Sequence, residues 1–154
     1  MTPYETAINA LAEALETKLE IASDRLCDVE VDGRLIVLRP IGEAEQSIMM
    51  FALVAGAPEN GELSAEVKDC ALSMNLFGTN TLGGHLGLFG QSLVLSAPPM
   101  EATGLTAEAF AENMLAFSRF AGEMEQKFAA ANGSSDEETE AVPDAVPEGD
   151  FIKV

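Results

Sequence analysis

CALSMNLFGTNTLGGHLGLFGQSLVLS, residues 70–96, is the stretch of this chain that decides the fold. It begins as the end of an apolar helical stripe and passes through a glycine-rich crossing. Two short apolar strands follow at 85–89 and 92–97, joined through Gly90-Gln91. The stretch contains one histidine and one cysteine but no Asp, Glu, Lys or Arg. In a chain this acidic, so apolar a segment indicates a surface made for protein contact.

Two amphipathic helices are predicted outside this stretch, and each has a recognisable start. Residues 2–5 (TPYE) form a capping box, in which Thr2 is the N-cap and Glu5 reaches back to it. Thr106 caps the other helix. The apolar side chains of both recur every three or four residues: Tyr4, Ile8, Leu11, Leu15 and Leu19 in the first, and Phe110, Met114, Phe117, Ala121, Met124 and Phe128 in the last.

Three strands are predicted between residues 27 and 55. Residues 27–31 alternate apolar and acidic side chains, which is typical of a strand with one wet face. Asp32-Gly33 predicts a type I′ turn, and residues 35–38 form the return strand. A third strand, residues 47–55, follows a loop at 40–46. The second and third strands are apolar without alternation, so we expect cover on both of their faces.

A middle helix completes the order of elements. It follows an interruption at residues 57–61, ends before Gly78, and carries the stripe Leu63, Val67, Cys70, Ala71, Met74 and Phe77. The resulting order, α-β-β-β-α-β-β-α, predicts an α+β domain in which an antiparallel sheet is covered by helices. We place this domain at residues 1–132.

Residues 133–154 differ in composition and are predicted to form a disordered acidic tail. Their sequence GSSDEETEAVPDAVPEGD is rich in carboxylates and has little apolar area to bury. The last four residues, Phe151-Ile152-Lys153-Val154, are mostly apolar again. They either continue the disordered tail or contact an apolar groove of this chain or of a neighbour.

The charge of the chain limits its partners. The formal net charge is −18, from 26 acidic and 8 basic residues. Phosphate backbones and anionic membranes need clustered cations, so we predict no nucleic-acid partner. No apolar run approaches the ~20 residues of a membrane span, and the first residues lack the basic start of a secretory signal. We therefore expect a cytoplasmic protein without membrane insertion, whose partner is basic or amphipathic.

No catalytic constellation is found in the sequence. His85 is the only histidine, and a place at a strand start or subunit contact is favoured over a role as general base or pH sensor. Cys27 and Cys70 lie in apolar patterns away from basic residues, so we expect reduced, buried thiols rather than nucleophiles or a disulfide. These residues do not supply a zinc site, and the glycines match no phosphate loop. We predict no enzyme activity, no metal and no cofactor.

The adjacent residues Met49 and Met50 must point to opposite faces of the third strand. One of them is expected to face the core. The other faces something that the monomer need not supply, and methionine adapts to varied apolar partners.

In order and spacing, these elements resemble the class I type III secretion chaperones, the Tir-chaperone family, over residues 4–128. The sharpest part is ALSMNLFG at residues 71–78, which is similar to the helix-ending apolar–Asn–Leu segment of the family. LGL at 86–88, LVL at 93–95 and a final amphipathic helix from residue 105 follow in the family's order. The Asp32-Gly33 hairpin, the small size and the acidity also match.

This resemblance implies a homodimer that binds the N-terminal region of a secreted effector in extended form, without nucleotide or metal. It implies a client-binding set on the first helix and first strands: Leu11, Leu15, Ile36, Leu38, Met49, Phe51 and Leu53. It implies a dimer interface on the second helix and the strands after it: Met74, Leu76, Phe77, Leu86, Leu88 and Leu93. About half of these side chains are expected to be core, because the same stripes also build the domain.

Two further functions stay open on the sequence. One is a protein-binding or regulatory module that has this fold but no role in secretion. The other is an enzyme that uses carboxylates alone, which requires a cluster of acids in a deep pocket.

Overall fold

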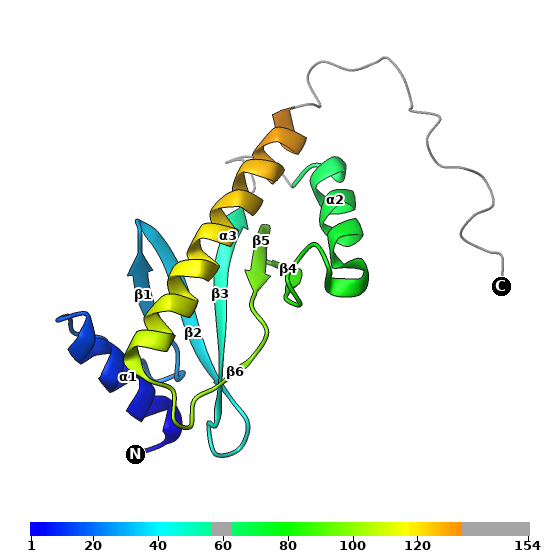
Figure 1. Cartoon of the computed structure of the whole chain (residues 1–154). Helices are drawn as coiled ribbons and strands as arrows, with labels where there is room; N and C mark the ends of the chain where they lie inside the picture. The colour runs from blue at the N-terminus through cyan, green and yellow to red at the C-terminus, as the bar shows by residue number, and fades with distance from the viewer. Residues whose placement is uncertain (57–62, 134–154) are drawn as a thin grey trace, which may run out of the picture.

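The computed structural model describes residues 1–56 and 63–133, and the predicted order of elements is confirmed with one short strand added (Figure 1). The predicted interruption at 57–61 and almost all of the predicted tail lie outside the described residues. The elements are α1 (Pro3–Ala14), β1 (Cys27–Val31), β2 (Arg34–Ile41), β3 (Ser47–Ala55), α2 (Ala65–Asn75), the 3-10 turn η1 (Leu76–Gly78), β4 (His85–Phe89), β5 (Ser92–Ser96), β6 (Met100–Glu101) and α3 (Ala107–Gly133).

The six strands form one antiparallel sheet with the order β1-β2-β3-β5-β4, and β6 pairs with the beginning of β3. Asp32 and Gly33, with φ of 50° and 74°, make the type I′ turn predicted between β1 and β2. Ile36 lies between Val29 of β1 and Ala52 of β3, so these three side chains share one face. The α+β class with an antiparallel sheet is confirmed.

The described helices pack on that same face of the sheet. α3 crosses β3, with α1 beside its first turns and α2 near its end (Figure 1). The Tyr4 hydroxyl of α1 donates to the Leu38 carbonyl oxygen at 3.2 Å, which ties this helix to β2. The predicted stripe of α3 is buried along its whole length: Phe110, Met114, Phe117, Ala121, Met124 and Phe128. The core therefore lies between the helices and one sheet face.

Two predicted boundaries are wrong. α1 ends at Ala14 and does not reach Leu19, because Thr17 N–H donates to the Ala12 carbonyl (3.1 Å) and closes the last turn. This bond and the positive φ of Glu16 (50°) form a Schellman motif without its usual glycine. β2 continues to Ile41, so Pro40 pairs with Ile48 instead of lying in a loop.

Arg25 joins the start of α1 to the β2–β3 loop. Its guanidinium donates to Glu45 (2.7 Å from Nε to Oε1) and to Glu5 (3.1 Å), and it lies 5.9 Å from the centre of the Tyr4 ring. Thr2 and Glu5 form the predicted capping box. The hydrogen bond from Arg25 is the main reason why the pKa of Glu45 lies below its usual value.

The side chain of Asn75 joins the end of α2 to β4. Its Nδ2 donates to the Leu86 carbonyl oxygen and its Oδ1 accepts from the Leu86 N–H, both at 2.8 Å. The amide therefore satisfies both backbone groups of Leu86 as a neighbouring strand would. Gly84 precedes β4 where only glycine fits, since an added Cβ would lie 2.1 Å from the Ser96 carbonyl oxygen. Gly84 thus allows the crossing to approach the backbone of β5 closely.

Replacing Asn75 by alanine is expected to lower the free energy of unfolding by about 1–3 kcal/mol, because the Leu86 N–H and C=O lose their partner. Urea unfolding measures this loss. Asn80→Ala, at an exposed position of the same crossing, is the control and should change stability by less than about 0.5 kcal/mol. Equal effects of the two substitutions would contradict the role of the Asn75 amide.

Candidate protein-binding surface

The second face of the sheet is covered by no described helix and is largely apolar. Side chains on this face alternate with the buried ones along β2, β3, β5 and β4. Val37 lies opposite Phe51, and Leu53 lies opposite Val94. We call this surface the open face, and its residues are Leu35, Val37, Arg39, Met49, Phe51, Leu53, Val94, His85 and Phe89.

The prediction that β2 and β3 are covered on both faces is wrong for the described chain. Leu35 is 54 % exposed and Leu53 is 52 % exposed, although Leu35 begins one apolar run and Leu53 lies within the other. The sequence pattern is that of a sheet covered twice, whereas the described helices form a single layer. The open face therefore has the apolar composition of a protein core, but no described helix covers it.

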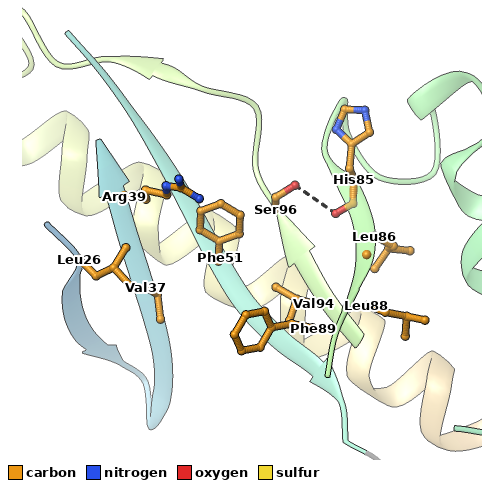
Figure 2. Close-up of a pocket in the computed structure, with 11 residues that line it drawn as sticks. Leu26, Val37, Arg39, Phe51, His85, Leu86, Leu88, Phe89, Val94 and Ser96 are labelled. Carbon is orange, nitrogen blue, oxygen red and sulfur yellow. Dashed lines mark hydrogen bonds between the residues drawn. The ribbon is translucent and has the colours of Figure 1, made fainter. Parts of the chain in front are cut away.

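Phe51 lies in a shallow groove of about 460 Å³ on the open face (Figure 2). Val37 and Val94 flank it from the neighbouring strands, and Leu26 adds an apolar side chain at the border next to β2. On the other side the groove is bordered by β4, where Phe89 is 81 % exposed. The groove is thus an apolar depression with a protruding aromatic ring at its border.

The charged groups lie around this groove rather than within its apolar centre. The Arg39 side chain lines the groove and has no hydrogen bond or ion pair with any described residue. Asp28 and Glu30 are exposed on the neighbouring strand β1, and Asp28 lies opposite Val37. Ser96 uses its hydroxyl within the sheet, donating to the His85 carbonyl oxygen at 3.2 Å. The surface suits an apolar ligand that carries charges of both signs.

A second group of exposed apolar side chains lies on α2, the crossing and β4. Phe77 is 88 % exposed and has a positive φ of 62°, so the prediction that it belongs to the buried stripe of the middle helix is wrong. Leu72, Leu76, Leu82 and Leu88 are each more than half exposed. These side chains offer a second apolar contact surface.

The predicted client-binding set divides between the surface and the core. Met49, Phe51 and Leu53 lie in a row on the open face, and Leu15 is exposed at the end of α1. Leu11, Ile36 and Leu38 are core side chains with 0 % exposure, so their inclusion in a contact surface is wrong. Sequence reasoning missed Leu35, Val37 and Val94, which the alternation from Phe51 and its cross-strand neighbours identifies.

The predicted dimer set divides in the same way. Leu76, Phe77 and Leu88 are exposed, whereas Met74, Leu86 and Leu93 are buried in the core. The three exposed residues belong to the second apolar surface, and their contact with another copy stays a prediction. His85 is exposed at the start of β4 and lines the groove on the open face.

The described cysteines form no disulfide, and the described acidic side chains form no group that could hold a metal ion. Cys27 and Cys70 are free thiols, and burial raises the pKa of Cys27 to about 11. Among residues 1–56 and 63–133, no three His, Cys, Asp or Glu side chains are grouped so as to hold a metal ion. None of the described helices is both long and apolar enough to cross a bilayer.

The fold and the open face define an α+β protein with a sheet surface available to a partner. The model of the Tir chaperone protein (CesT) family matches residues 6–126, and the chain belongs to this family. No curated protein sequence matches the chain.

Solved structures show the same fold at low sequence identity. A chain of the HopA1–SchA chaperone–effector complex is 15 % identical with a TM-score of 0.61, covering 80 % of this chain and 94 % of its own. A chain of the Yersinia pestis type III secretion chaperone SycH in complex with a fragment of YscM2 is 16 % identical (TM-score 0.56, 79 % and 98 % covered). A chain of the ExoU–SpcU complex from the type III secretion system of Pseudomonas aeruginosa is 17 % identical (TM-score 0.52, 82 % and 97 % covered).

The adjacent methionines test which face is open. Met50 is 4 % exposed in the core, so Met50→Ala is expected to lower the free energy of unfolding by about 2–5 kcal/mol. Met49 lies on the open face, and Met49→Ala should cost less than about 1 kcal/mol. Urea unfolding of the two variants gives the comparison. A larger loss for Met49→Ala would contradict the assignment of the faces.

Proposed function

We propose that this protein is a non-catalytic type III secretion chaperone of the cytoplasm. It binds the N-terminal region of a secreted effector in extended form and keeps that client soluble and competent for export. The observation that carries this proposal is the uncovered apolar open face in a member of the Tir chaperone family. Support comes from structural relatives solved as a chaperone–effector complex and as a type III secretion chaperone in complex with a protein fragment.

The open face binds a client by burying apolar side chains, and this binding needs no chemical step. An extended client presents alternate side chains on one side, and these apolar side chains pack into the groove that Val37, Phe51 and Val94 line. Ordering a client of this kind costs ~2–5 kcal/mol of the gross interaction, so a large buried area is required. The high negative charge keeps the uncovered protein from associating with itself nonspecifically.

The second apolar surface is the proposed homodimer contact. Leu76, Phe77 and Leu88 have the exposure that such a contact requires. Two copies related by a two-fold axis present two equivalent open faces, and a client bound to one meets the second at a raised effective concentration.

The homodimer is tested by light scattering on the purified chain. We expect the mass of a dimer, and a shift toward monomer for Phe77→Ser, because this change removes an aromatic ring from the contact. Thr79→Ala, at an exposed position two residues away, is the control and should remain dimeric. A monomeric wild-type chain would contradict the homodimer.

Client binding is tested by co-expressing the chain with secreted proteins of the same organism, followed by pull-down. Phe51→Glu should reduce the recovered client at least about ten-fold, because an unpaired carboxylate in an apolar groove is costly to desolvate. Asn113→Glu adds the same charge at an exposed position of α3 and should leave recovery unchanged. Circular dichroism verifies that both variants fold.

The outcomes separate the function from the site. If wild-type chain recovers no client, the proposed function is wrong. If the wild-type chain and Phe51→Glu recover equal amounts, the client binds elsewhere and the assignment of the groove is wrong.

A further inference from the structure

The end of α3 lies beside the open face. Asn132, the last residue but one of this helix, and Leu53 of the open face line the same small cavity of about 240 Å³. α3 runs past the end of β3 (Figure 1), and the chain that follows Gly133 starts at this end of the sheet. Residues 134–154 lie outside the described residues, but their point of departure is known.

The length of the following chain is sufficient to reach the groove. Phe51 is two residues from Leu53 along β3, which is about 7 Å at the rise of a strand. The seventeen residues 134–150 span at most about 55–60 Å when fully extended. This span is much longer than the step from Leu53 to Phe51, and Leu53 lines one cavity with the end of α3.

The residues after this stretch match the groove in chemistry. Residues 151–154 (FIKV) carry three apolar side chains, including the first large ones after a run whose only apolar residues are alanine, valine and proline. Asp150 precedes them, and Arg39 at the groove has no partner among the described residues. Lys153 lies within them, and exposed Asp28 and Glu30 stand next to the groove on β1. Apolar content and both charge signs are therefore complementary.

We propose that residues 151–154 bind the groove around Phe51 on the open face of the same chain. The occupant is tethered, so its effective concentration at the groove is high without strong contacts. A consequence, which rests on the proposed function, is that a client must displace this segment. The segment then protects the open face while the client is absent and lowers the apparent affinity for clients that bind weakly.

The absence of tryptophan from the chain provides a direct test that needs no client. Phe151→Trp introduces a single indole into the full chain. We expect its emission maximum at a shorter wavelength, and its quenching by acrylamide weaker, than in the same variant unfolded in urea. Adding Phe51→Glu should move the emission back to that of a water-exposed indole. Adding Asn113→Glu should leave it unchanged.

A second groove variant guards against loss of the fold. Leu53→Glu changes a half-exposed side chain of the open face and should also expose the F151W indole while circular dichroism stays unchanged. An indole that is water-exposed in the otherwise unchanged full chain overturns the proposal. An emission shift that depends on protein concentration also overturns it, because a neighbouring copy then supplies the segment or covers the groove.

Discussion

The structure depends on the fact that the sheet has more apolar surface than the described helices cover. β2 and β3 carry apolar side chains on both faces, while the described helices cover only one. On the covered face, Ile36 and Met50 are core, and on the other, Val37 and Phe51 remain accessible. Because successive residues of a strand point to opposite faces, the strands that build the core inevitably present a second apolar surface. That surface is the reason to assign a protein partner.

The groove on this surface exists because β4 is held at the far side of the sheet. Asn75 fixes Leu86 through two hydrogen bonds at the end of α2, and Gly84 allows the chain to pass close to Ser96. β4 then places Phe89 along the groove that Phe51 lines. A polar side chain and a glycine, neither of which contacts the groove, therefore determine its border.

An uncovered apolar face is costly for a protein that must stay in solution. The net charge of −18 opposes nonspecific association, and a tethered segment of the same chain adds protection that a client removes by competition. In this arrangement release and binding depend on relative affinities rather than on a chemical step.

The local elements were predictable because their causes lie close together in the sequence. The capping box at Thr2 and the turn at Asp32-Gly33 need contacts over a few residues. The apolar stripe of α3 recurs every three or four residues over many turns, so it predicts a helix without ambiguity. The end of α1 was not predictable, since Glu16 takes the positive φ that usually marks a glycine. The exposure of Phe77 was hidden for a related reason: an apolar residue in helical register does not reveal that the backbone leaves the helix before it.

The candidate site was only half predictable from the sequence. The family resemblance named Phe51 and Leu53 as contact residues, but it named Ile36 and Leu38, which are core, equally. Either face of an apolar strand can be buried in the core. Which face is buried depends on where the helices pack, and this packing joins residues that are far apart in the chain. Sequence thus determined that the strands are apolar and in which order they come. Tertiary structure alone decided which side of them became the core and which side was left for a partner.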